Sequence, residues 1–194
     1  MLISNINKYD VILGSASPRR QELLSALGIN FKIKINKQQE KYPSNLEGAK
    51  ISEFLAKRKS DAILEDLSGI YLLITADTIV TYNKKILHRP SNEKEAINTL
   101  NLLSGKEHEV ITSCCIKSRE KECIFSSFTR VYVKNLSKEE IEYYVKKYKP
   151  FDKAGSYGIQ EWIGHIGIKR IDGSYNNVVG LPTAELYEKL RLFF

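Results

Sequence analysis

The sequence predicts an α/β fold with a mixed β-sheet, and three observations lead to this expectation. Short apolar runs typical of buried strands alternate along the chain with longer segments whose apolar residues recur at helical spacing. Some strand segments are joined by short turns, as at Asn83-Lys84, so part of the sheet is antiparallel. No repeat and no linker rich in glycine, proline or serine divides the 194 residues, so we expect one domain over residues 1–194.

The chain begins with a predicted strand–loop–helix unit. Residues 10–13 are typical of a short buried strand, and Ser17 and Pro18 suit the N-cap and the first position of a helix. Three leucines form one apolar face of that helix, and Gly28 ends it. Alternating apolar residues over 30–36 then predict a half-exposed strand.

The middle of the chain continues the alternation of helices and strands. Residues 47–64 have a helical pattern, and the apolar run over 70–76 is typical of a central strand. After the predicted hairpin, Asn92 and Glu95 form a capping box for a helix that ends at Gly105.

Two adjacent strands follow, over 109–117 and 123–133, joined by a short charged turn. Ser137 and Glu140 form a second capping box, and the helix that they begin stops before Pro150.

The remainder of the chain is rich in glycine. Two long loops, over 152–160 and 172–182, each contain Gly-Ser-Tyr, and we expect a strand near 166–171 and a terminal helix from Thr183. Loops of this length commonly carry binding groups, although each loop alone is equally typical of a connector.

Cysteine use and hydropathy favour a cytoplasmic protein. The three cysteines are odd in number and lack C-x-x-C spacing, which favours free thiols over disulfides or a zinc site. The first residues lack the apolar core of a signal peptide, and no apolar run reaches the roughly 18 residues typical of a membrane span. We therefore expect a soluble cytoplasmic protein with no membrane partner.

The net charge of +7 suits a polyanionic partner, either nucleic acid or a phosphorylated small molecule, although lysines scattered in this way are more typical of a solvated surface. Nucleic-acid binding would need basic residues interleaved with exposed aromatic residues on one face. Tyr143 and Tyr144 beside Lys146 and Lys147 come nearest to this pattern, and a half-buried helix face explains them better. We expect no nucleic-acid partner.

Two arginines at the start of the first predicted helix indicate an anion site. The first turn of a helix disfavours cations and attracts anions, yet Arg19 and Arg20 stand there, after a loop of small residues. Arginine offers bidentate contacts to phosphate. A plain helix start with two solvated arginines is the alternative. The chain has no Walker A motif and no G-x-G-x-x-G motif.

Asp77 follows the predicted central strand directly. Ligands gather at the carboxyl ends of strands in α/β sheets, so a carboxylate there suits binding of a divalent metal or activation of a water. An aspartate that caps a turn is equally typical of the local sequence. Lys57 on the preceding helix is typical of a solvated position, and for Lys59 a functional role stays open.

Seven stretches taken together resemble the Maf family of nucleotide pyrophosphatases. They are SASPRRQELL, Glu40, Lys59, ADT, LSGKEHEV, DKAGSYGIQ and GSYNNVVGLP, in the order and spacing of the family from about Ile12 to the final helix. The resemblance is closest to the branch that acts on dTTP and UTP, through Pro18-Arg19-Arg20, Thr78 and Gln160.

The resemblance implies a Maf/inosine-triphosphatase-like fold, with a twisted mixed sheet and flanking helices in two lobes around a cleft, and it allows a homodimer. It implies hydrolysis of a pyrimidine nucleoside triphosphate (dTTP, UTP or a modified form) to the monophosphate and pyrophosphate, a house-cleaning reaction. It also implies a divalent cation, Mg²⁺ or Mn²⁺.

The resemblance assigns the chemistry to five residues. Asp77 would be the general base and would also touch the metal, and Glu40 would help to hold the metal. Ser15, Arg20 and Lys59 would neutralise the triphosphate and its developing charge, with Lys59 counted among the catalytic groups.

Base selection and one further phosphate contact fall to other residues. The resemblance implies that Arg19, Thr78 and Gln160 sort the base, since a glutamine amide can pair with the edge of uracil or thymine. Where the family commonly has Gly-Lys-Pro after the hairpin, this chain has His88-Arg89-Pro90, so Arg89 would bind phosphate with changed reach.

A nucleotide-binding regulator of cell division or septum formation, with little turnover, is the alternative function. A pure binder needs no general base, so Asp77, Glu40 and Lys59 argue against it. Release of pyrophosphate from a panel of nucleotides would separate the two functions.

Overall fold

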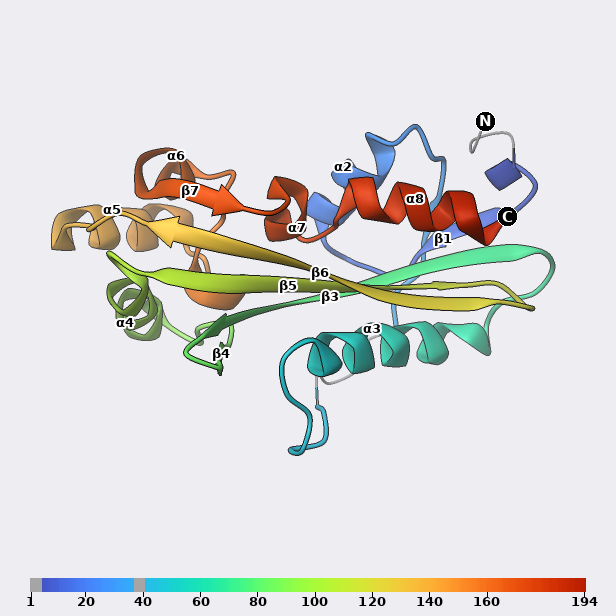
Figure 1. Ribbon diagram of the computed structural model, residues 1–194, viewed down its shortest axis with the longest axis horizontal. Helices are drawn as coiled ribbons and strands as arrows, with labels where there is room; N and C mark the ends of the chain where they lie inside the picture. The colour runs from blue at the N-terminus through green and yellow to red at the C-terminus, as the bar shows by residue number, and fades with distance from the viewer. Residues whose placement is uncertain (1–4, 37–40) are drawn as a thin grey trace. The chain divides into compact units, whose positions relative to one another are not determined.

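The computed structural model describes residues 5–36 and 41–194, and it has a seven-stranded mixed sheet covered by helices (Figure 1). The strands are β1 (Asp10–Leu13), β2 (Lys32–Ile33), β3 (Tyr71–Tyr82), β4 (Lys85–Leu87), β5 (Glu107–Lys117), β6 (Glu122–Val133) and β7 (Ile168–Asp172). Their order is β2-β1-β3-β5-β6-β7, with β4 paired to β3 outside this path. β1 is parallel to β2 and β3, whereas β4 on β3 and β7 on β6 are antiparallel. The predicted α/β class with a mixed sheet is confirmed.

The helices that flank the sheet are α2 (Pro18–Ser25), α3 (Ala49–Leu64), α4 (Glu93–Leu103), α5 (Lys138–Tyr148), α6 (Trp162–Gly167), α7 (Tyr175–Val179) and α8 (Thr183–Phe193), with one 3₁₀ turn, η1 (Ala154–Ser156). Within the described ranges, no helix has both the length and the apolar character needed to cross a membrane.

The chain divides into two compact units. Unit 1 comprises Met1–Asp77, Thr112–Ser127 and Gly180–Phe194, and unit 2 comprises Thr78–Ile111 and Phe128–Val179. The boundaries fall inside β3, β5 and close to the middle of β6, so these strands contribute residues to both units. A single domain over 1–194 stays a prediction.

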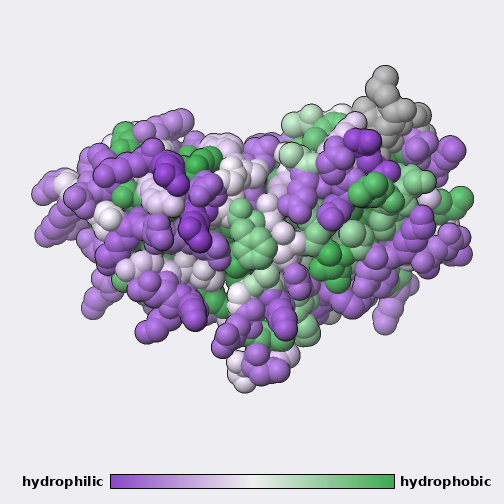
Figure 2. All heavy atoms as spheres, viewed as in Figure 1, coloured by the Kyte–Doolittle hydropathy of each residue, from purple (hydrophilic) through white to green (hydrophobic). Residues whose placement is uncertain are grey.

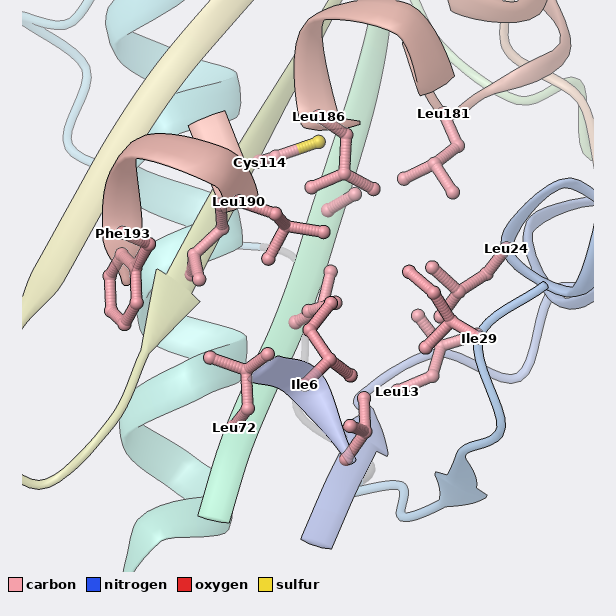
Figure 3. Packing of buried hydrophobic residues seen from close by; sticks show 14 of the residues in the cluster. Ile6, Leu13, Leu24, Ile29, Leu72, Cys114, Leu181, Leu186, Leu190 and Phe193 are labelled. Carbon is pink, nitrogen blue, oxygen red and sulfur yellow. The ribbon is translucent and has the colours of Figure 1, made fainter. Parts of the chain in front are cut away.

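Unit 1 has an apolar cluster on each face of its part of the sheet, because successive strand side chains point to opposite faces. Leu13 and Leu72, both fully buried, belong to the cluster that also contains residues of α2 and α8 (Figure 3). Their neighbours Ile12 and Leu73 belong to a second cluster with Ile63 of α3. In Figure 1, α3 and α8 accordingly lie on opposite faces of these strands.

Unit 2 has its own core, which joins α4, α5 and the loop before α6 to strands β5 and β6. Leu100 of α4, Tyr144 of α5 and Val131 of β6 are each 2% exposed or less, and they share this cluster with Tyr157 and Ile159. Hydrophilic residues cover most of the molecular face shown in Figure 2, as expected when apolar side chains are buried in such cores.

The predicted hairpin turn and the capping box at Ser137 are confirmed, and the predicted capping box at Asn92 is confirmed in part. Asn83 and Lys84 have φ values of 49° and 64°, the left-handed pair that a two-residue hairpin turn requires. The Asn92 side chain accepts a hydrogen bond from the Glu95 backbone N–H at 2.9 Å, but the Glu95 carboxylate accepts from the Ser91 backbone N–H at 2.8 Å and not from that of Asn92. Ser137 and its Glu partner three residues later form both hydrogen bonds of a capping box at the start of α5.

Two local predictions need correction, and a third is confirmed only in position. β2 spans only two residues of the predicted 30–36 strand, because it lies at the edge of the sheet and pairs with β1 alone; Ile33 is 48% exposed. Ser17 and Pro18 do occupy the predicted N-cap and first position of α2, although the Ser17 side chain makes no capping hydrogen bond. The short helices α6 and α7 were not predicted, because glycines at 164 and 167 and the brevity of both helices hide the helical pattern.

Candidate active site

The loop between β1 and α2 begins at a glycine that allows very close packing. A Cβ atom built on Gly14 would lie 2.5 Å from Thr75 Cγ2 and 2.8 Å from Ile63 Cδ1, so a larger residue would force these two buried side chains to move. The next residue, Ser15, is 7% exposed, and its hydroxyl accepts a hydrogen bond from the Ser17 backbone N–H at 3.3 Å. The loop is therefore drawn against β3 and α3, with the Ser15 hydroxyl at the start of α2.

Arg20 joins three segments of unit 1 that are distant in sequence. Its Nε donates to the Gly180 carbonyl at 2.8 Å, and its Nη1 donates to the Ala76 carbonyl at 2.8 Å and to Ser15 Oγ at 3.4 Å. The planar guanidinium can make such divergent hydrogen bonds, whereas a lysine ammonium offers no comparable fork. Because Ala76 immediately precedes Asp77, the positive charge of Arg20 lies beside the backbone that carries the predicted general base.

Asp77 is 3% exposed, and Lys59 donates a hydrogen bond to its Oδ1. The two residues form an ion pair in which the Asp77 side chain is 5% exposed and the Lys59 side chain 23% exposed. A carboxylate that is removed from water needs such a partner, since an isolated buried charge costs several kcal/mol, about the magnitude of many whole-domain stabilities. The structure therefore brings together the predicted residues Ser15, Arg20, Lys59 and Asp77 within unit 1.

The predicted position of Asp77 at the end of a strand is wrong. β3 continues through Asp77 to Tyr82, so the carboxylate projects from the middle of a 12-residue strand. Local sequence predicts a strand end at Asp77 because a charged residue is rarely buried inside a strand. The ion pair with Lys59 allows Asp77 to occupy such a buried position.

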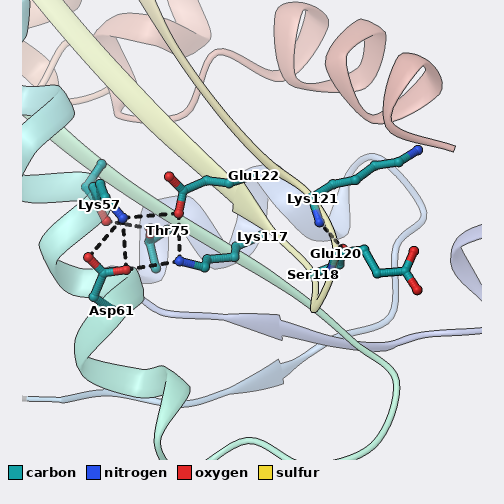
Figure 4. A network of polar contacts seen from close by, with 9 residues as sticks. Lys57, Asp61, Thr75, Lys117, Ser118, Glu120, Lys121 and Glu122 are labelled. Carbon is teal, nitrogen blue, oxygen red and sulfur yellow. Dashed lines mark hydrogen bonds and ion pairs between the residues drawn. The ribbon is translucent and has the colours of Figure 1, made fainter.

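Helix α3, which carries Lys59, is fixed to the sheet by polar contacts on both sides of that residue. Thr75 Oγ1 of β3 donates to the Ala56 carbonyl at 2.7 Å. An ion-pair network joins Lys57 and Asp61 of α3 to Lys117 and Glu122 of the two neighbouring strands, as Figure 4 shows. These contacts limit the movement of the helix and so help to keep Lys59 at Asp77.

The carboxylates of this network are held in the charged form. Burial opposes the shift, but hydrogen bonds from Lys57 and Lys117 lower the pKa of Asp61 below its ordinary value of 3.8. The hydrogen bond from Lys117 is the largest cause that lowers the pKa of Glu122. Since the folded pKa lies below the unfolded one, this stabilisation is present above the unfolded pKa and is lost as the pH falls through the folded pKa.

Replacing Asp61 with Asn is therefore expected to reduce the acid sensitivity of the fold. The Asp61 side chain is 46% exposed, so the decrease in melting temperature near neutral pH should be small and should come from the loss of both lysine contacts together. The difference from the unaltered protein should shrink between about pH 5 and pH 2. Thermal unfolding across this pH range measures the effect. Asp66→Asn is the matched control, because the Asp66 carboxylate is 65% exposed beside Lys34 and such pairs contribute little. Equal pH profiles for Asp61→Asn and Asp66→Asn would contradict the assignment.

Three of the four other residues predicted to select the base or to bind phosphate belong to unit 2. Thr78 follows Asp77 in β3, Arg89 is exposed just after β4, and Gln160 is half-buried in the turn before α6. Arg19 is half-buried in the first turn of α2, in unit 1. The roles of these four residues stay predictions.

Asp77 is the predicted metal ligand that the structure describes; Glu40 lies outside the described residues. No group of three or more His, Cys, Asp or Glu side chains suited to a metal occurs in the described parts of the chain. A site of one or two carboxylates fits Mg²⁺ when substrate phosphates supply further oxygens. The buried Asp77 carboxylate has the hard oxygen donors that this arrangement needs.

Sequence reasoning missed the carbonyl partners of Arg20. Gly180 is 160 residues away from Arg20 in the chain, and its carbonyl oxygen carries no signal in a side-chain pattern. The glycine-rich loop that contains Gly180 is typical of a binding loop, but its sequence does not identify the contact with Arg20.

Comparison with known proteins gives matches along nearly the whole chain. The family model described as Maf-like protein matches residues 10–193. A dTTP/UTP pyrophosphatase of Christiangramia forsetii is 48% identical over 191 residues, covering 98% of this chain and 97% of the relative. Proteins of the same name from Bacteroides thetaiotaomicron and Porphyromonas gingivalis are 45% and 46% identical, with 98% and 99% of this chain and 99% and 98% of the relatives covered.

A solved nucleoside-triphosphatase / dITP/XTP pyrophosphatase of Mycobacterium abscessus aligns with 66% of this chain and 76% of its own, at 10% identity and a TM-score of 0.37. That similarity is too low to bear on the fold or the function. The family match, by contrast, covers nearly all of the chain, and the relatives match it along their whole length. The chain belongs to the Maf family.

Proposed function

We propose that this protein is a nucleoside triphosphate pyrophosphatase that hydrolyses dTTP and UTP to the monophosphate and pyrophosphate. The buried Asp77–Lys59 pair, beside the backbone that Arg20 and Ser15 hold, is the observation that carries the proposal. The names of relatives that are 43–48% identical over almost the full chain support the same substrates. A regulator with little turnover gains no support, because a pure binder needs no buried carboxylate paired in this way.

In the proposed reaction, Asp77 acts as the general base. Its carboxylate accepts a proton from a water molecule while the water oxygen forms a bond to the α-phosphorus. The bond between the α-phosphorus and the oxygen that bridges to the β-phosphorus breaks, and pyrophosphate leaves with that electron pair. The hydrogen bond from Lys59 holds the carboxylate in one orientation throughout, which is what a base needs to meet a positioned water.

Cations of the protein would stabilise the negative charge of the triphosphate. Arg20 and Lys59 lie next to Asp77, and Ser15 adds a buried hydroxyl at the start of α2, where the backbone favours anions. Arg89 would contribute from the segment after β4. Arg20 would do so while its hydrogen bonds to two carbonyls keep its guanidinium fixed, so little conformational entropy is lost when substrate binds.

Asp77 and Glu40 would hold a divalent cation, Mg²⁺ or Mn²⁺. When bound, the cation neutralises phosphate charge and polarises the phosphoryl oxygens. Arg19, Thr78 and Gln160 would select the pyrimidine base.

The decisive experiment measures pyrophosphate release from dTTP, UTP, their modified forms and the purine triphosphates, with and without added metal. The proposal expects the highest kcat/KM for the pyrimidine substrates. Nucleotide binding without pyrophosphate release would instead favour the regulator.

Replacing Gln160 with Ala is expected to reduce kcat/KM for UTP and dTTP much more than for a poor substrate such as GTP. A site that hydrogen-bonds the correct base has unpaired polar groups when the wrong base is bound, and this difference produces the selectivity. Loss of the Gln160 amide removes the difference, so the UTP:GTP ratio of kcat/KM should fall by roughly tenfold or more. Asn101→Ala, an exposed amide truncation in α4, is the control. An unchanged ratio would rule out Gln160 as a base-reading residue.

We propose a cytoplasmic location, in line with the free cysteines of the chain. Burial raises the pKa of Cys114 to about 12 and that of Cys115 to about 11, so both stay unreactive thiols.

A homodimer and the lack of a nucleic-acid partner stay predictions, which light scattering and a filter-binding measurement would test.

A further inference from the structure

Gln160 occupies the tip of a tight turn in unit 2. The Glu161 backbone N–H donates to the Gly158 carbonyl at 3.0 Å, which closes a four-residue turn with Ile159 and Gln160 at its two central positions. The Gly164 backbone N–H donates to the Glu161 carbonyl at 2.8 Å and starts α6 directly after the turn. The direction of the Gln160 side chain thus depends on how this turn is held.

One buried phenol oxygen binds both ends of the turn. The Tyr144 hydroxyl accepts a hydrogen bond from the Gly158 backbone N–H at 3.0 Å and donates one to Glu161 Oε2. Tyr144 has no exposed surface, and its ring stacks on Tyr148 with the centroids 5.1 Å apart. Burial, followed by the hydrogen bond with Glu161, raises the pKa of Tyr144, so the phenol keeps the proton that it donates.

A lysine holds the same carboxylate from its other oxygen. Lys153 Nζ lies 3.0 Å from Glu161 Oε1, and the two side chains are only 10% and 20% exposed. Hydrogen bonds with a charged partner in such surroundings are stronger than those between neutral groups. Glu161 therefore has both oxygens engaged, and the residue directly after Gln160 has little freedom to rotate.

A second buried contact fixes the chain just before the turn. The Tyr157 hydroxyl and His108 Nε2 are 2.7 Å apart, and both residues are less than 9% exposed. Tight packing adds to this constraint, because a Cβ atom on Gly164 would lie 1.8 Å from the Ile159 carbonyl oxygen. Buried groups thus hold residues on both sides of Gln160.

We propose that Tyr144, with Glu161 and Lys153, positions Gln160 for selection of the pyrimidine base. These three are positioning residues, since they act through the turn and not by contact with the substrate. The inference rests on the proposed function, in which Gln160 reads the base. Tyr144 would thus contribute to base selectivity indirectly, although its sequence pattern is only that of a buried helix residue.

The test replaces Tyr144 with Phe, which removes only the oxygen that binds both ends of the turn. The UTP:GTP ratio of kcat/KM should fall by roughly tenfold, mainly through a higher KM for UTP, because the turn loses two hydrogen bonds of which one is to a charged group. The matched control is Tyr143→Phe. Tyr143 is the preceding residue of the same helix, it is 44% exposed, and its hydroxyl bonds to Lys147, so its loss should leave the ratio unchanged.

A double variant shows whether Tyr144 acts through Gln160. The ratio for Tyr144→Phe/Gln160→Ala should equal that for Gln160→Ala alone, because a positioning residue has no effect once the positioned group is gone. A purely structural role of Tyr144 would instead lower the melting temperature and the rates for all substrates together. An unchanged UTP:GTP ratio in Tyr144→Phe would overturn the inference.

Two further outcomes separate this inference from the proposed function. An unaltered protein that releases no pyrophosphate would overturn the proposed activity, and a Gln160→Ala variant with an unchanged ratio would overturn base reading by Gln160 and the positioning role with it. If Tyr144→Phe does not fold, Glu161→Gln supplies the test. It keeps the size of the side chain but loses the charge that binds Lys153, and the ratio should move in the same direction by a smaller factor.

Discussion

Replacing Asp77 with Asn is expected to lower kcat for dTTP and UTP by roughly 10²-fold or more, the usual contribution of a general base. The amide has nearly the size of the carboxylate, and its oxygen can still accept the hydrogen bond from Lys59. It cannot accept a proton from water. The fold should therefore survive while the chemical step fails. Single-turnover measurement of pyrophosphate release would report the rate of that step directly.

Asp10→Asn is the matched control for this variant. Asp10 is also an aspartate of a strand paired with a lysine, Lys32, but its side chain is 48% exposed. The control should retain the full rate, because an exposed pair contributes little to stability and Asp10 has no role in the proposed chemistry. Nucleotide binding by Asp77→Asn should persist in part, since the cations beside it remain. A rate above about a third of the unaltered value would show that Asp77 is structural, because loss of a general base costs far more than this.

Much of the fold could be predicted because local sequence encodes it. A two-residue turn with left-handed residues at Asn83 and Lys84, and caps at Asn92 and Ser137, depend on contacts within three or four residues. Such contacts form in the same way in many chains, so the pattern alone is sufficient.

Elements that depend on distant partners escaped local reasoning. β3 passes through a buried aspartate because Lys59, 18 residues earlier, pairs with it. β2 is short because it has one neighbour and not two. Neither cause appears in the residues of the strand itself, and intrinsic preferences yield to tertiary context in such cases.

The candidate site divides in the same way. The dipole argument at α2 and the resemblance indicated Arg20, Lys59 and Asp77, and the structure brings these three together in unit 1. The carbonyl groups that hold Arg20, and the phenol that holds the Gln160 turn, lie on segments whose sequence carries no mark of that role. Residue types indicate which chemistry is available, whereas the groups that orient the reacting side chains follow only from the tertiary structure.

Removal of divalent metal is expected to abolish pyrophosphate release. A triphosphate carries about four negative charges, and the candidate site presents the Asp77 carboxylate to it, so without a bridging cation the two repel each other. Lys59 offsets part of this repulsion, but it is already engaged with Asp77 and can give only a compact point charge.

Activity in excess EDTA should therefore fall to background and return when Mg²⁺ or Mn²⁺ is added. A second measurement makes the metal assignment independent of turnover. A ligand that binds only the folded state stabilises it, by about 2.7 kcal/mol when its concentration is 100 times its Kd, so Mn²⁺ with a non-hydrolysable nucleotide should raise the melting temperature. That increase should be smaller in Asp77→Asn, which keeps Lys59 but loses the charged ligand, and unchanged in Asp10→Asn. Full turnover in EDTA would exclude a metal-dependent reaction, and an equal increase in melting temperature for both variants would remove Asp77 from the metal site while leaving its role as a base intact.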